Sequence, residues 1–417
     1  MKRMAMHTVI ILAAYLPADV AVAQVRTISR AELIEKTSGF WIGQLVGNYM
    51  GFPFESVYIE EPIPVLVDRY YTPLDADADQ VRMNRDDHRA WAPILFTYFQ
   101  GAYSDDDTDI EFVTLHAVEK YGLDIDYEQI AEAWKAHINR RIWVANRTAR
   151  DLMAKGMIPP DTGKKENNPN WFQIDPQLVN EIWSAFYPGR VARAVERAEW
   201  GARITNDGWG VHPTIAYGAM ISEAFFSDDP VHLVRTAMAR IPAEGPFYEG
   251  MVDLLRWYEE NPRDWRATRQ KLHDKYYRYQ KDGYEAPVSV VSSLINGLCG
   301  VMALLYGEGD FTRSVGIAVS AGYDCDNQAA TVGGLLGVMH GGDAIPEKFT
   351  RDAPSRGHWD KPFNDTYINA SRDGLPIDNR ISDIVERIVD VAEKAILRDG
   401  GEKIETDKGI VYKIPRN

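Results

Sequence analysis

The sequence predicts an all-α protein, a compact helical bundle that carries a small C-terminal helix and β-hairpin. Apolar residues recur at helical spacing along most of the 417 residues, and strand patterns are nearly absent between residues 30 and 370. Small residues gather in segments that are otherwise apolar, which is typical of helices packed closely in a core. We therefore expect one helical domain over residues 30–370, followed by an appended unit over residues 376–417.

The first 23 residues have the layout of a cleavable signal peptide. A basic start at Lys2 and Arg3 precedes a short apolar stretch, and Ala21-Val22-Ala23 supplies small residues at the cleavage positions. The apolar stretch is too short to span a bilayer. We expect removal after Ala23 and export of the mature chain, either to a periplasm or to the medium.

The first strong helix signal is SGFWIGQLVGNYMG at 38–51, where glycine recurs every four residues. This spacing places the glycines on one face of a helix, so that another backbone can approach closely. The residues concerned are Gly39, Gly43, Gly47 and Gly51. Gln44 and Asn48 interrupt the apolar run, which favours a core helix over a membrane span.

Residues 288–306 carry no charge, and their length requires a transmembrane helix to be considered. Polar residues fall at three- and four-residue spacing along the segment, as on one stripe of a buried helix. We favour a central core helix. Residues 329–339 repeat the same small and apolar composition, and the Asn- and Pro-rich residues 159–170 predict a loop.

The composition changes near the C-terminus. Apolar residues from Ile381 to Ala395 form one face of an amphipathic helix, and Gly400-Gly401 ends it. Residues 402–414 predict a β-hairpin that turns at Asp407-Lys408-Gly409. We expect this unit to pack on the main domain.

Charge and cysteine content argue against several classes of function. The net charge of −15 is unfavourable for a nucleic-acid partner, because phosphate binding needs a basic surface. The two cysteines, Cys299 and Cys325, have no spacing suited to zinc, and we expect them to be small buried residues.

Two acidic clusters carry the functional signal. The first, SDDDTDIEF at 104–112, directly precedes a helical pattern, and its carboxylates are Asp105, Asp106, Asp107, Asp109 and Glu111. Helix capping accounts for one or two of them, and a bound cation is the alternative for the rest. The second, YDCDN at 323–327, brings two carboxylates and an amide oxygen to the start of an apolar helix. Hard divalent cations such as Mg²⁺ prefer oxygen-only sites of this kind.

The two clusters resemble the metal-binding motifs of the ADP-ribosylglycohydrolase family, (S/T)-D-D-T and G-D-x-D-(S/T). Asp105 stands where the family has Thr or Ser, and Asn327 stands where it has a hydroxyl residue. The resemblance implies a compact orthogonal helical bundle with two Mg²⁺ ions per chain, for which Mn²⁺ or Ca²⁺ could substitute. The implied metal ligands are Asp105, Asp106, Asp107, Asp324, Asp326 and Asn327.

Two further segments match the family more loosely. GQLVGNYMGFPFE at 43–55 resembles its N-terminal glycine motif with Asn48 in place of Asp, and Glu55 matches an acidic residue beside substrate and metals. NDGWGVHPT at 206–214 resembles a loop that approaches the substrate. The resemblance implies catalytic roles for Glu55, Asp106, Asp107 and Asp324, and substrate contacts from Glu55, Asn206, Gly208, Trp209 and His212.

The implied activity is hydrolysis of a glycosidic bond at the anomeric carbon of a ribose-like furanose. We expect a small-molecule or saccharide substrate, no nucleic acid and no membrane span. An exported protein meets little ADP-ribosylated substrate, so a secreted glycoside hydrolase acting on a furanoside or other saccharide without ADP is an alternative. A binding or structural relative without catalysis is a second alternative, and the retained acidic residues argue against it.

Overall fold

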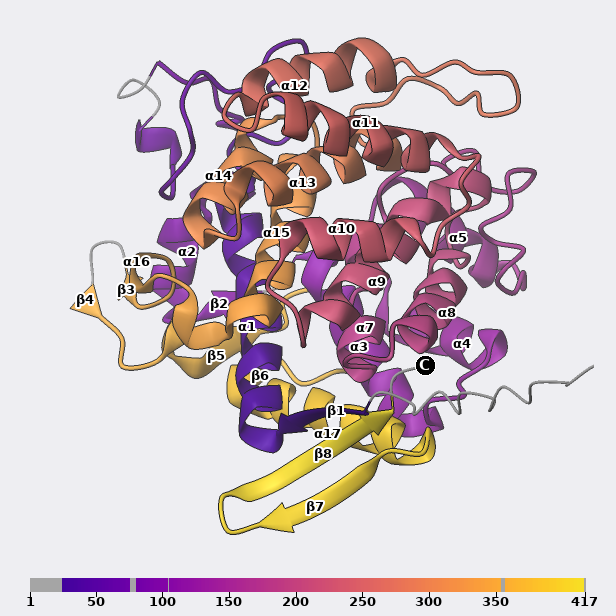
Figure 1. The fold of residues 1–417 in the computed structure, drawn as a ribbon, viewed down its shortest axis with the longest axis vertical. Coiled ribbons are helices and arrows are strands. Elements are labelled where there is room, and N and C mark those ends of the chain that lie inside the picture. Colours follow the sequence, from indigo (N-terminus) through magenta and orange to yellow (C-terminus); the bar gives the residue numbers. More distant parts are fainter. Residues whose placement is uncertain (1–24, 76–79, 104, 354–356, 416–417) are drawn as a thin grey trace, which may run out of the picture.

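Helices α1 (Arg30–Gly51) and α15 (Cys325–His340) form the centre of the fold. The computed structural model describes residues 25–75, 80–103, 105–353 and 357–415, so the signal peptide predicted over residues 1–23 lies outside the described part. The indigo α1 and the orange α15 lie side by side, with the other helices around them (Figure 1). The predicted all-α fold is confirmed.

The glycine face of α1 is the surface on which α15 packs. A Cβ atom added at Gly43 would lie 2.1 Å from the carbonyl oxygen of Gly333. One added at Gly39 would lie 2.1 Å from the carbonyl oxygen of Gly337. The two backbones therefore touch with no side chain between them, as the four-residue spacing predicted, and residues 329–339 are the partner.

A second layer of helices surrounds this pair. Helices α9 (His212–Ala224), α13 (Ser293–Gly307) and α14 (Phe311–Ser320) pack against α15. All fifteen residues of α13 are buried, so the core helix expected over residues 288–306 is present from Ser293 onward, while residues 288–292 precede it outside the helix. No helix within the described ranges is long and apolar enough to cross a membrane.

The remaining helices complete the bundle, with α11 and α12 at one end of the molecule and α17 at the other (Figure 1). Their bounds are α2 (Ala92–Phe99), α3 (Asp106–Tyr121), α4 (Tyr127–His137), α5 (Val144–Ala154), α6 (Pro176–Val179), α7 (Ile182–Phe186), α8 (Val191–Ala202), α10 (Pro230–Met238), α11 (Pro246–Glu260), α12 (Trp265–Leu272), α16 (Glu347–Thr350) and α17 (Ile381–Arg398). Residues 159–170 form turns.

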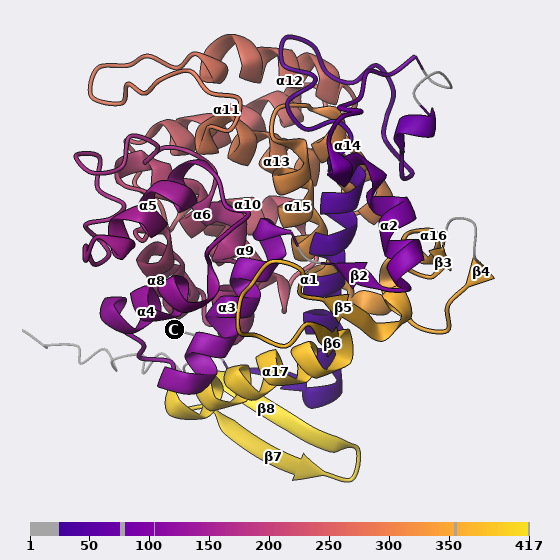
Figure 2. The ribbon, with the colours of Figure 1, turned by 180° about the vertical axis from the view of Figure 1, so that it is seen from behind.

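The C-terminal hairpin pairs with the start of the described chain. Strands β7 (Glu402–Thr406) and β8 (Gly409–Pro415) are joined by the turn expected near Asp407, and β1 (Val25–Ser29) adds to the free edge of β8. Helix α17 buries its apolar face against α1, next to this sheet (Figure 2). The N-terminal strand was not expected, because five residues with one buried side chain give no alternating pattern.

Short strands also occur inside the helical domain. They are β2 (Ala102–Tyr103), β3 (Asp352–Ala353), β4 (Gly357–His358), β5 (Thr366–Ile368) and β6 (Asp378–Arg380). Strand β2 runs parallel to β5 and leads into the first acidic cluster. Runs of two or three residues are too short to give a strand signal in the sequence.

Candidate active site

The two acidic clusters meet in one pocket of about 210 Å³. The pocket lies at the N-terminal ends of α3 and α15, and the segments after α1 and before α5 close it. Its lining residues are Glu55, Arg89, Asp106, Asp107, Trp143, Val144, Asn146, Ile174, Asp175, Val291, Asp324, Asp326 and Asn327. Six of these are carboxylates, so the pocket is strongly acidic.

Helix capping explains one residue of the first cluster. Asp105 is the N-cap of α3, and its side chain accepts a hydrogen bond of 2.6 Å from the backbone N–H of Asp106. The free N–H groups and the helix dipole stabilise negative charge at this position. Asp106 and Asp107, which follow in the first turn, face the pocket.

The other two carboxylates of the cluster belong to the core. Asp109 is fully buried and pairs with Arg372 at 2.5 Å, and Ser371 also donates to it. Glu111 accepts a 2.6 Å hydrogen bond from the backbone N–H of Ile182. The crowding in SDDDTDIEF thus separates into three residues at the pocket and two that are neutralised or bonded inside the bundle.

The second cluster supplies the closest group of carboxylates. Asp324 is the N-cap of α15, and its backbone N–H donates to the side-chain oxygen of Asn296 at 3.0 Å. One carboxylate oxygen from each of Glu55, Asp324 and Asp326 lies within 4.8 Å of the others. Three carboxylates so close repel one another unless a cation or protons lie between them.

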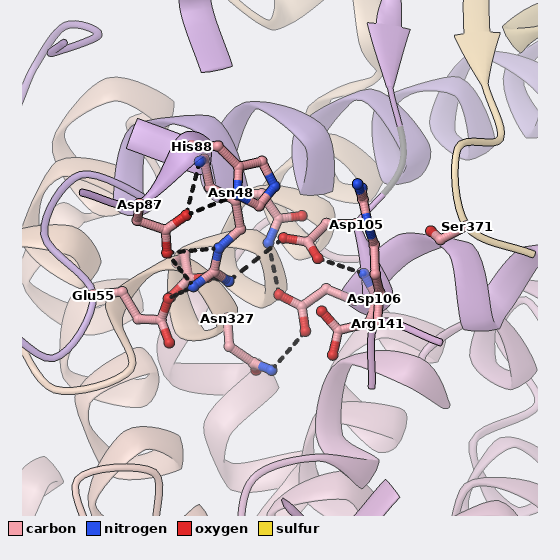
Figure 3. A network of polar contacts seen from close by, with 12 residues as sticks. Asn48, Glu55, Asp87, His88, Asp105, Asp106, Arg141, Asn327 and Ser371 are labelled. Carbon is pink, nitrogen blue, oxygen red and sulfur yellow. Dashed lines mark hydrogen bonds and ion pairs between the residues drawn. The ribbon is translucent and has the colours of Figure 1, made fainter. Parts of the chain in front are cut away.

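Two amide side chains connect the clusters. Asn48, near the end of α1, donates to one carboxylate oxygen of Asp107 at 2.8 Å, and Asn327 donates to the other at 3.1 Å. Figure 3 shows these two amides turned toward the one carboxylate that lies between them. Asn48 and Asn327 are two of the positions at which the chain departs from the family motifs, and both hold Asp107 here.

The donor set fits a hard divalent cation. Asp326 is 2 % exposed, yet its Oδ1 atom has no hydrogen-bond partner, and the same holds for the buried Oδ1 of Asn327. Buried oxygens without partners are costly, and a cation satisfies them. Of the predicted ligands, all except Asp105 line the pocket, and Asp105 borders it through its ion pair with Arg89 at 3.7 Å.

Arg89 is a pocket residue that the sequence did not reveal. It follows the N-cap Asp87 in a 3₁₀ turn at His88–Trp91, and its guanidinium pairs with Glu55. No motif or spacing distinguishes it from the other arginines. Asp175, Asn146 and Trp143 also line the pocket without a signal in the sequence, since each lies in or beside an irregular segment.

The predicted substrate loop lies outside this set of lining residues. The amide of Asn206 donates to the carbonyl of Gln173 at 2.6 Å, and the indole of Trp209 donates to the carbonyl of Tyr284 at 3.1 Å. Gly208 packs near Lys165, and His212 begins α9 beside Gly245. The structure does not bring these four residues to the pocket, so their substrate contacts stay predictions. Asn206 does fix the segment that ends at the lining residue Ile174.

Burial shapes the protonation of the site. Burial and the charge of Asp326 raise the pKa of Glu55 to about 8, although Arg89 opposes the shift. Burial alone raises the pKa of Asp175 to about 7, and that of Glu181, in the core beside Gln44, to about 8. In the unfolded chain such carboxyl groups titrate near ~4.

We expect the metal-free protein to lose stability as the pH rises from about 5 to 8, because the folded chain holds protons there that the unfolded chain releases. The midpoint of thermal unfolding in chelator should fall by several degrees over this range. The Glu181→Gln variant, which removes one such group outside the pocket, should show a shallower fall. A midpoint that rises with pH would contradict these protonation states.

The fold and the pocket define a class: an all-helical protein with a carboxylate-lined pocket where two core helices begin. Within that class, the chain belongs to the ADP-ribosylglycohydrolase family, whose sequence model matches residues 29–374. A solved structure described as an "ADP-ribosylglycohydrolase-related protein complex" superposes with a TM-score of 0.51 at 15% identity, covering 87% of this chain and 99% of that one. Curated proteins gave no significant match. Family membership supports a glycohydrolase activity.

Proposed function

We propose that this protein is a Mg²⁺-dependent hydrolase that cleaves a glycosidic bond at the anomeric carbon of a ribose-like furanose. The convergence of Glu55, Asp324 and Asp326 within 4.8 Å supports this proposal most directly. It joins the end of the glycine motif at 43–55 to the second acidic cluster at 323–327, and these segments lie far apart in the sequence. The buried, unpartnered oxygen of Asp326 favours a cation there.

The chain's own residues supply the acid–base chemistry. Glu55 in its ionised form accepts a proton from the attacking water as the bond from the anomeric carbon to the leaving group breaks. Burial and the charge of Asp326 raise the pKa of this carboxyl group to about 8, so ionised Glu55 is a stronger base than an ordinary glutamate. The carboxylates of Asp106 and Asp107 stabilise the positive charge that develops on the sugar ring. Glu55, Asp324 and Asp326 would hold a Mg²⁺ ion, which would supply Lewis-acid chemistry for the substrate's sugar.

A furanoside without ADP is the second candidate substrate. Arg89 is the one basic side chain among the described residues that line the pocket, and it pairs with Glu55 and Asp87 rather than remaining open to a diphosphate. The pocket volume of about 210 Å³ also suits a single sugar ring. Trp143, which is 49% exposed at the pocket, offers an aromatic face for stacking.

A paired substrate screen tests these alternatives. We expect the protein to hydrolyse a nitrophenyl ribofuranoside or an ADP-ribosyl substrate, with turnover lost in EDTA and restored by Mg²⁺. Turnover of the furanoside alone would reject ADP-ribose as the substrate and support the second candidate. Turnover of neither, with Mg²⁺ present and the protein folded by circular dichroism, would contradict the proposed hydrolase and favour a binding relative.

A further inference from the structure

The guanidinium of Arg89 lies inside the acidic pocket, between the two motifs. Its Nη1 atom lies 3.7 Å from a carboxylate oxygen of Asp105 and 3.9 Å from one of Asp326, and its Nη2 atom bonds Glu55. A cation in this position acts on the same carboxylates that a metal ion would use. The question is whether it competes with an ion or accompanies one.

Local contacts hold this side chain in place. The carboxylate of Asp87 accepts hydrogen bonds from Nε of Arg89 at 3.0 Å, from Nη2 at 2.8 Å and from its backbone N–H at 2.8 Å. The rings of Phe52 and Trp143 lie 5.5 and 5.8 Å from the guanidinium carbon. Arg89 is therefore a fixed charge, in the fork geometry that suits carboxylates.

The two halves of the pocket differ in how their charge is balanced. At the first motif, Asp105 faces Arg89 and both oxygens of Asp107 accept amide hydrogen bonds. At the second motif, the three close carboxylates include Asp326, whose buried Oδ1 atom has no partner. Arg89 contacts both halves, since it also bonds Glu55 and lies 3.9 Å from Asp326. The halves differ because three carboxylates converge at the second motif, where a single guanidinium leaves negative charge for a divalent cation to balance.

We infer that the pocket takes one divalent cation, bound by Glu55, Asp324 and Asp326, and that Arg89 provides the positive charge at the Asp105 half in place of a second ion. A guanidinium and a dication repel strongly at short range in a low-dielectric pocket, so the fixed charge of Arg89 disfavours a second ion beside Asp105. The ion pair of Asp105 with Arg89 then explains why an Asp stands where the family motif has Thr or Ser. This inference rests on the proposed metal dependence and reduces the ion count from the two that the resemblance implies.

Manganese binding tests the ion count without any substrate. We expect equilibrium dialysis followed by elemental analysis to give one Mn²⁺ per native chain, with the electron paramagnetic resonance spectrum of an isolated ion. In Arg89→Gln, which removes the charge, we expect two Mn²⁺ per chain and a spectrum with exchange coupling between neighbouring ions. Arg89→Lys keeps a cation and should remain at one.

Each outcome decides the matter. Two coupled ions in the native chain would overturn the inference while leaving the proposed function intact. No bound Mn²⁺ in any of the proteins would overturn both. A single ion in Arg89→Gln, shown to be folded by its unfolding midpoint, would show that Arg89 does not exclude the second ion. The control is Arg82→Gln, since Arg82 pairs with the exposed Glu61 outside the lining set and its loss should not alter the count.

Discussion

The Asp324→Ala variant should lose hydrolysis and also lose the rise in unfolding midpoint that Mg²⁺ gives to the native protein. Asp324 contributes one of the three carboxylates that converge within 4.8 Å, and its backbone is fixed by Asn296. Removing a direct ligand should weaken metal affinity by more than ~100-fold. Substituting a residue that only hydrogen-bonds to a ligand already lowers metal affinity by about 10- to 100-fold. The ligand-linked stabilisation then disappears at millimolar Mg²⁺.

The unfolding midpoint of metal-free Asp324→Ala distinguishes the loss of metal binding from misfolding. Burial and the neighbouring charge of Asp326 raise the pKa of Asp324 well above its usual range. Without a metal ion, the ionised carboxylate of Asp324 therefore destabilises the folded protein. In chelator at pH 8, the variant should therefore unfold at or above the native midpoint. Asp175→Asn, which alters a lining carboxylate outside the close group, should keep the response to Mg²⁺. An unchanged Mg²⁺ response in Asp324→Ala would contradict the metal site.

The parts of the site that sequence could predict are those with a local cause. Asp105 and Asp324 each begin a helix, and the spacing of Asp324 and Asp326 places both at one helix end. A tight turn followed by an apolar helix gives such residues a recognisable pattern. These residues converge only because α1 packs on α15. The glycine spacing predicted which face of α1 is packed closely, but it did not predict that α15 is the helix that packs there.

The residues that could not be predicted are positioned by irregular segments. Arg89 reaches Glu55 because the segment at 84–91 folds back on the end of α1, held by a backbone hydrogen bond from Asn84 to Pro53. The periodicity of the sequence around residues 84–91 does not predict that this segment folds back on the end of α1. The buried roles of Asp109 and Glu111 were equally hidden, because their partners Arg372 and Gln44 lie far away in the chain.

The contact between α1 and α15 supports the fold and the pocket together. Asn48 lies near the end of α1 and Glu55 shortly beyond it, while Asp326 and Asn327 lie in the first turn of α15. Gly51 is so close to Asp326 that a Cβ atom on it would lie 2.2 Å from the Cα of Asp326. Any change that separates these helices must therefore also separate Asn48 and Glu55 from Asp326 and Asn327.

The Gly43→Ala variant should destabilise the protein by about 3 kcal/mol or more, because its methyl group would meet backbone rather than a movable side chain. Both helices are enclosed by others, so neither can shift freely to make room. Urea unfolding measures the loss, and Gly122→Ala provides a comparison at a glycine without close contacts. Gly122 has φ +89° and ψ 175°, a backbone conformation that is essentially restricted to glycine, so about 1–3 kcal/mol of strain is expected there despite the open space. A loss below ~1 kcal/mol in Gly43→Ala would mean that the helices do not touch through their glycine faces.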